Sequence, residues 1–74
     1  MIIETNGCFA SDLSEAQSAL PYRVERMWRD GESMQPHILA VTDDEDEGWE
    51  YKVVNGGMLV RTSDNKTRTP EEWV

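Results

Sequence analysis

The 74-residue chain has little of what most functional classes require. One cysteine cannot form an internal disulfide, and one cysteine with one histidine is too few for a zinc site. No apolar run approaches the ~20 residues that cross a bilayer, and the first residues lack the basic and apolar regions of a signal peptide. We therefore expect a single cytoplasmic domain over residues 1–74, with no membrane contact.

Positive charge is also scarce. Lys and Arg total 7 against 15 Asp and Glu, so the net charge is −8. Contacts to phosphate need a surplus of basic side chains, and we therefore expect no direct binding of nucleic acid.

Catalytic signals are equally few. His37 and Cys8 are the only residues of their types, and no third group near either one would orient a nucleophile. Gly56-Gly57 lacks the helix start and the lysine of a phosphate-binding loop. A chain this short has little room for a deep cleft. We expect a protein that is not an enzyme, with no catalytic residue and no cofactor.

The negative charge is concentrated in one part of the chain. Residues 30–51 contain eight acids and no base, whereas the charges of the remaining residues nearly cancel. These eight acids are Asp30, Glu32, Asp43, Asp44, Glu45, Asp46, Glu47 and Glu50. Placing Asp43 at the first position of a calcium loop puts Val54 at the twelfth, where a bidentate glutamate is needed. We therefore expect the acids to bind a partner rather than a metal.

The run from Asp43 to Glu47 suggests how such a partner is recognised. In an extended segment its carboxylates would follow one another at about 3.3 Å. Phosphates along one DNA strand follow one another at about 3.4 Å. The run would then imitate nucleic acid and occupy a basic groove of another protein. A solvated loop between two strands is the alternative interpretation.

Local patterns predict a small α+β domain. Met1–Glu4 is typical of an edge strand, and Asn6-Gly7 of a turn. Leu13, Ala16 and Leu20 predict a helix over 12–20, which Pro21 ends. Residues 22–29 fit a strand better than a helix, although both remain open, and Asp30-Gly31 indicates a hairpin turn. The run from Ile38 to Val41 predicts a strand over 37–42.

Asn55-Gly56 is the strongest turn signal, since this pair favours two-residue hairpins. The resulting register places Trp49, Tyr51, Val53, Met58 and Val60 on one face and pairs Glu50 with Arg61. Thr69, Pro70 and Glu72 start a last helical turn that returns Trp73 to the sheet. The predicted order is β-α-β-β-β-β: a short N-terminal helix on an antiparallel sheet of four or five strands.

Arg23, Arg26 and Arg29 are expected to neutralise the acidic segment. The three tryptophans, Trp28, Trp49 and Trp73, are expected in the core, because so small a domain needs their apolar area.

In size, acidity and lack of catalytic residues, the chain resembles small phage-encoded antagonists of host defence, including anti-CRISPR and anti-restriction proteins. The resemblance covers composition and length rather than aligned residues. It implies an inhibitor that competes, by bulk and charge, for a basic nucleic-acid-binding surface of a partner protein. A second hypothesis is a structural or assembly protein that self-associates, or docks into a larger complex, through sheet edges and exposed aromatic side chains.

Overall fold

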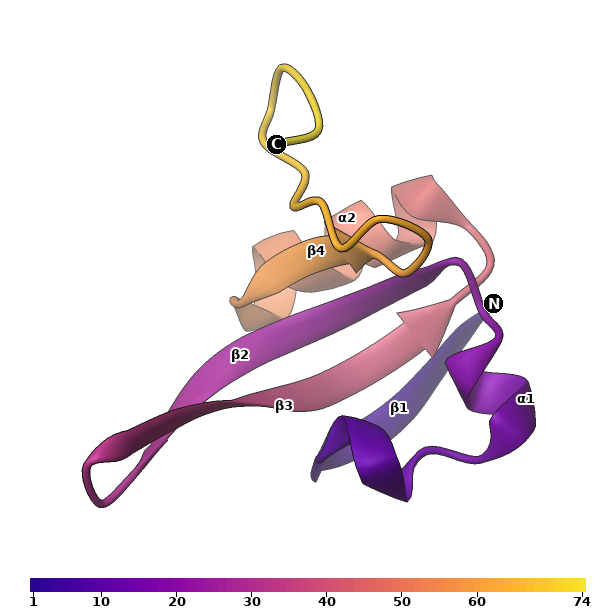
Figure 1. Cartoon of the computed structure of the whole chain (residues 1–74). Helices are drawn as coiled ribbons and strands as arrows, with labels where there is room; N and C mark the ends of the chain where they lie inside the picture. The colour runs from indigo at the N-terminus through magenta and orange to yellow at the C-terminus, as the bar shows by residue number, and fades with distance from the viewer.

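The computed structural model shows a four-stranded antiparallel sheet with the spatial order β1-β3-β2-β4 (Figure 1). It describes all 74 residues, except that the side chain of Asp30 lies outside the described residues. The elements in chain order are β1 (Ile2–Cys8), the 3-10 turn η1 (Ala10–Asp12), α1 (Glu15–Ser18), β2 (Tyr22–Asp30), β3 (Ser33–Thr42), α2 (Glu45–Asn55) and β4 (Met58–Arg61). An antiparallel α+β domain is thus as expected, but the order of its elements is not.

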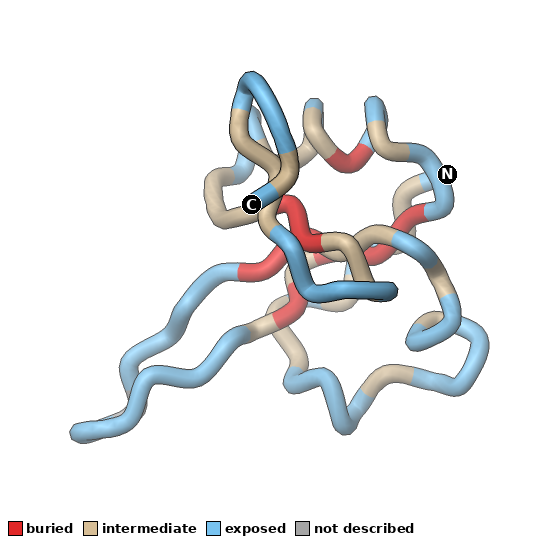
Figure 2. Tube along the Cα trace, turned by 45° about the horizontal axis from the view of Figure 1, so that its top comes forward, coloured by how far each residue is buried: buried red, intermediate tan, exposed pale blue. Residues whose placement is uncertain are grey.

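Helix α2 packs closely on one face of the sheet. Gly48 is buried, and a Cβ atom there would lie only 2.8 Å from Leu59 Cδ1 and 3.1 Å from Thr42 Cγ2. Val24 stands opposite both Ala40 and Leu59 in the strand register, so all three share the face under the helix. These three side chains are fully buried, and the core lies where the buried stretches of Figure 2 meet.

The opposite face carries the connection between β1 and β2. The predicted helix over 12–20 is shorter than expected: α1 covers only Glu15–Ser18, after the separate turn η1. Ser14 caps it, because Ser14 and Gln17 exchange side-chain to backbone hydrogen bonds of 3.1 and 3.0 Å. One turn of helix buries little apolar area, so the main helix of the fold is α2.

The β2–β3 hairpin extends beyond the rest of the sheet (Figures 1 and 2). The strand predicted over 22–29 is confirmed, and β3 begins four residues before the predicted start at His37. β1 stops pairing with β3 at Ile38, and β4 stops pairing with β2 at Glu25. Residues 26–37 therefore form a two-stranded projection, which we call the arm.

The predicted Asn55-Gly56 hairpin is wrong, because residues 45–55 form α2 instead of a loop and a strand. The Asp44 carboxylate accepts hydrogen bonds from the backbone N–H groups of Asp46 (2.9 Å) and Glu47 (3.2 Å), which caps the helix. Gly56, with φ +82°, ends it, and its N–H donates to the Lys52 carbonyl at 2.7 Å. A glycine with positive φ ends helices as readily as it turns hairpins.

The predicted pairing therefore fails as well. β4 pairs with β2, not with residues 49–54, and Arg61 binds Asp64 rather than Glu50. Val53 is exposed on α2, whereas Val60 is buried in the sheet, so the two do not share a face.

The predicted C-terminal helical turn does not form: Pro70 and Glu71 are bends, and an isolated β-bridge pairs Arg68 with Trp73. Thr69 Oγ1 accepts hydrogen bonds from the N–H groups of Glu71 (3.3 Å) and Glu72 (3.1 Å). Trp73 then stacks on Tyr22 of β2, with 5.9 Å between ring centroids, and lies under the guanidinium of Arg61. Trp73 thus returns to the sheet and covers the end of β2 beside α2.

Candidate partner-binding surface

Part of the acidic run serves the fold. Asp44 caps α2, and Glu45, Asp46 and Glu47 lie in its first turn, where negative charge stabilises the positive end of the helix dipole. Glu45 also accepts a 3.0 Å hydrogen bond from the Trp73 indole. The run is therefore the start of a helix and not the extended segment whose spacing resembles DNA.

Two acids of the run bind the amino group of Met1. Its nitrogen lies 2.8 Å from Asp43 Oδ1 and 2.7 Å from Glu47 Oε2. The hydrogen bond to Asp43, followed by that to Glu47, raises the pKa of this amine to about 10. The same amine lowers the pKa of Asp43. Both carboxylates are therefore partly neutralised by a charge of the chain itself.

The eight predicted acids do not lie together. Glu32 is at the tip of the arm, far from the six acids of residues 43–50 (Figure 1). The side chain of Asp30 lies outside the described residues. The eight acids therefore do not form one continuous surface, because the arm carries Glu32 away from α2.

The arginines of β2 also have other partners than expected. Arg23 forms an ion pair with Glu25 on the same strand. Arg26 Nη2 donates to the Asn55 carbonyl (2.7 Å), and Arg29 Nε donates to the Gly31 carbonyl (3.1 Å). Among the described residues, none of the three forms an ion pair with the acids of 30–51, and of those acids only Asp43 and Glu47 have an ion-pair partner, the Met1 amine.

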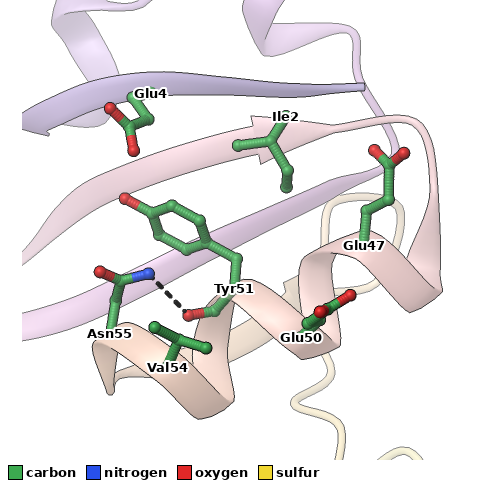
Figure 3. Close-up of a pocket in the computed structure, with 7 residues that line it drawn as sticks. All are labelled: Ile2, Glu4, Glu47, Glu50, Tyr51, Val54 and Asn55. Atoms are coloured by element: carbon green, nitrogen blue, oxygen red, sulfur yellow. Dashed lines mark hydrogen bonds between the residues drawn. The ribbon is translucent and has the colours of Figure 1, made fainter.

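A groove between β1 and α2 collects three carboxylates around an apolar floor (Figure 3). Its volume is about 350 Å³. Glu4 extends from β1, and Glu47 and Glu50 extend from α2. The complete lining is Ile2, Glu4, Glu47, Glu50, Tyr51, Val54 and Asn55, with no basic side chain.

Helix periodicity explains why these residues meet. Glu47, Glu50, Tyr51 and Val54 are three or four positions apart, so they project from one side of α2. Asn55 at the helix end donates through Nδ2 to the Tyr51 carbonyl at 3.0 Å. Because residues 49–54 are predicted as a strand, sequence reasoning separates Glu50 from Tyr51 on opposite faces.

Glu4 is the residue that the sequence prediction missed. It stands opposite Ala40 in the register of β1 and β3, on the α2 side of the sheet. Burial raises the pKa of the Tyr51 hydroxyl, and the charge of Glu4 and a hydrogen bond to it raise it further. Only the pairing of β1 with β3 reveals this neighbour, because Glu4 is isolated from the other acids in the sequence.

The groove is suited to an amphipathic cation. Lys and Arg have apolar stems and charged ends, and such stems pack on apolar surface while the charge seeks a polar partner. Here Ile2 and Val54 offer the apolar surface, and Glu4 and Glu50 offer the carboxylates. A carboxylate binds a guanidinium or ammonium by hydrogen bonds that charge strengthens.

The described part of the chain contains no group of three or more His, Cys, Asp or Glu side chains placed to hold a metal ion.

Within those residues, no helix combines the length and the apolar character needed to cross a membrane.

The chain was also compared with known proteins. No protein-family model, curated protein or solved structure matches it.

Proposed function

We propose that this protein is a non-enzymatic binding protein that engages a basic surface of a partner protein through the groove between β1 and α2. The observation that carries the proposal is a groove in which Glu4 and Glu50 flank apolar side chains, with no basic side chain in the lining; its third carboxylate, Glu47, is held by the Met1 amine. A lysine or arginine of the partner enters this groove as an anchor.

The surroundings of the groove support the same partner. Asp46 and Glu50 are exposed on α2, and Val54 at its end is 77% exposed. An apolar side chain next to free carboxylates provides both burial and charge for a lysine or arginine stem. Anchor residues at the centre of protein interfaces commonly combine these two contributions.

Inhibition follows from occupancy, with no bond made or broken. If the partner binds nucleic acid through lysines and arginines, this protein occupies those side chains and so prevents nucleic acid from binding them. Since both surfaces are charged, association is fast at low salt and weakens as salt screens the attraction. The proposal therefore includes competition with nucleic acid, as in the class of anti-defence proteins that the composition resembles.

Binding of a model basic peptide tests the groove. The probe is a blocked octapeptide in which lysine alternates with serine, measured by calorimetry at low and at high salt. Glu4→Gln with Glu50→Gln removes two groove charges, and we expect the affinity to fall about fivefold to tenfold.

The matched control is Glu71→Gln with Glu72→Gln, which changes the net charge equally on exposed residues outside the groove. We expect this control to change the affinity by less than about twofold. Equal losses in both double variants would contradict the proposal, because net charge alone would then explain the binding. An affinity that does not respond to salt would contradict it as well.

A further inference from the structure

The arm has two open strand edges, and they are not equivalent. Beyond Glu25, β2 pairs with β3 alone, since β4 ends opposite Glu25. Before Ile38, β3 pairs with β2 alone, since β1 pairs no further than Ile38. Each edge of the arm can in principle accept another strand, and the backbone groups that it presents decide whether it does.

Proline identifies the groups that point outward. Pro36 stands opposite Met27 and has no N–H to donate, so Met27 and Pro36 are a non-hydrogen-bonded pair of the antiparallel ladder. Hydrogen-bonded and non-hydrogen-bonded pairs alternate along such a ladder, so Arg29 and Met34, two residues further on, are a non-hydrogen-bonded pair as well. The Glu25 carbonyl, two residues before Met27, indeed faces Gly57 on the β4 side. Met27 and Arg29 therefore direct their N–H and C=O groups away from β3.

The two edges differ in what they offer a strand. The β3 edge presents Met34 and then Pro36, which interrupts any ladder because it lacks a donor. The β2 edge presents two complete pairs of donors and acceptors, at Met27 and Arg29. Native proteins usually protect such an edge with proline, a bulge or a covering segment. In the described part of the chain no strand pairs with this edge at Met27 or Arg29, and the segment after α2 reaches only its start, where Arg26 Nη2 donates to the Asn55 carbonyl.

The side chains at this edge are also unusual for a small acidic protein. Trp28, which the sequence analysis placed in the core, is 54% exposed, and Met27 is 42% exposed. Met34 on the neighbouring strand is 55% exposed. Methionine and tryptophan are residues that protein interfaces favour, so the arm presents an interaction surface rather than a solvated one.

A second copy of the chain does not fit this edge. Pairing both outward residues of each arm would place Met27 opposite Arg29 of the other copy. Residue 31 of that copy would then stand opposite Glu25, where Met58 of β4 already lies. The edge also carries Arg26 and Arg29 with no acid between them, so a carboxylate-bearing segment is the complementary occupant.

We infer that the β2 edge of the arm binds an extended segment of a partner protein by strand addition, and that this segment alternates apolar and acidic residues. Backbone groups of Met27 and Arg29 pair with the segment. Since successive side chains of a strand point to opposite faces, the carboxylates of the segment lie on the face of Arg29, which binds them, and its apolar side chains lie on the other face against exposed Trp28. This surface is separate from the groove between β1 and α2 and selects the opposite charge.

Amide hydrogen exchange tests the inference on the intact protein. The probes are three blocked octapeptides in which valine alternates with glutamate, serine or lysine. We expect the glutamate peptide to slow exchange at the amides of Met27 and Arg29, with a weaker effect from the serine peptide and none from the lysine peptide. Unchanged exchange at both amides with saturating glutamate peptide would overturn the inference, as would equal protection by the lysine peptide.

A pair of proline variants separates this edge from the rest of the arm. Arg29→Pro removes an outward N–H on the β2 edge, and Met34→Pro removes the outward N–H of its cross-strand partner on the β3 edge. We expect Arg29→Pro to weaken the glutamate peptide about tenfold or more, and Met34→Pro to leave its affinity within about twofold.

Equal effects of the two prolines would overturn the choice of edge. Protection of Met27 and Arg29 that rises with protein concentration alone, together with a dimer in sedimentation, would overturn the choice of occupant in favour of a second copy. If either proline variant fails to fold, the exchange measurement on the unaltered protein still decides between these outcomes.

Discussion

Asp44 illustrates how one acid of a charged run acts within the fold rather than on a partner. Its carboxylate accepts from two backbone N–H groups at the start of α2 and so satisfies donors that the helix leaves free. Its neighbours Asp43 and Glu47 bind the terminal amine. The acids best placed to bind a partner are therefore Glu4 and Glu50 in the groove, together with exposed Asp46.

The cap can be tested by two substitutions at the same position. Asp44→Ala removes both hydrogen bonds, and we expect it to lower the free energy of unfolding by about 1 kcal/mol, within the ~0.5–2 kcal/mol range of such caps. Asp44→Asn keeps an acceptor oxygen, and we expect a loss of less than about half as much. Urea denaturation measures both. An equal loss in the two variants would show that charge, rather than capping, is what Asp44 contributes.

The ion pair of Arg61 with Asp64 gives a prediction about pH. Nε and Nη2 of Arg61 approach the two carboxylate oxygens at 3.0 and 2.6 Å. The hydrogen bonds from Arg61, followed by one from the Lys66 N–H, lower the pKa of Asp64 from 3.8 to about 2. Because the folded pKa is the lower one, this pair stabilises the fold above pH 4 and the contribution is lost as pH falls towards 2.

An NMR titration of the Asp64 carboxyl group measures this directly. In Arg61→Lys, which cannot form the paired hydrogen bonds, we expect the pKa to rise towards 3.8. A carboxyl that already titrates near 3.8 in the unaltered protein would contradict the prediction.

At the scale of elements, α2 shows why local patterns predicted the wrong structure. The alternation of Trp49, Tyr51 and Val53 fits a strand, and Asn55-Gly56 fits a hairpin. The signals for a helix were also present: Asp44 as a cap, with acids in the first turn. What decides between them is tertiary packing, since Gly48 lets the helix lie against Leu59. No local pattern reveals that contact.

The strands were more predictable. Residues 22–29 and 37–42 carry branched and aromatic side chains at strand spacing, and both form strands in the structure. The extension of the hairpin past its neighbours could not be predicted, because the lengths of β1 and β4 depend on where the turns around them fall. Trp28 is exposed because of that extension, since neither β1 nor β4 pairs with the arm.

Alanine substitution at Gly57 tests the turn after α2, with Gly31, a second glycine with positive φ, as the control. Gly57 has φ +93°, and a Cβ atom there would lie 2.4 Å from the Glu25 carbonyl oxygen. Gly31 at the tip of the arm has φ +62°, with no atom within 4 Å of such a Cβ. Gly31→Ala is therefore expected to cost about 1 kcal/mol, from the backbone conformation alone.

Gly57→Ala adds a clash with the backbone of β2, and we expect a total cost of about 2–4 kcal/mol. Chemical denaturation of both variants compares them directly. Equal costs would contradict the close approach of residue 57 to β2, and with it the way α2 connects to β4.

At the scale of the whole molecule, two surfaces of different character lie on different parts of the fold. The groove at β1 and α2 is lined by carboxylates, and the arm presents exposed apolar side chains beside two arginines. The concentration of acids in residues 30–51 predicted an acidic surface near α2. It could not predict the contribution of Glu4, which comes from the first strand, or the separation of Glu32, which the arm carries away.

The central claim is that the groove, and not the negative charge as a whole, binds a basic side chain. Chemical-shift mapping tests it most directly: the alternating lysine–serine octapeptide is titrated into isotopically labelled protein. We predict that the largest shifts occur at groove residues, namely Glu4, Glu50, Tyr51, Val54 and the Asn55 side chain. Shifts that are largest at Glu32 or at Glu71 and Glu72, or that are spread evenly over all acidic residues, would contradict the claim.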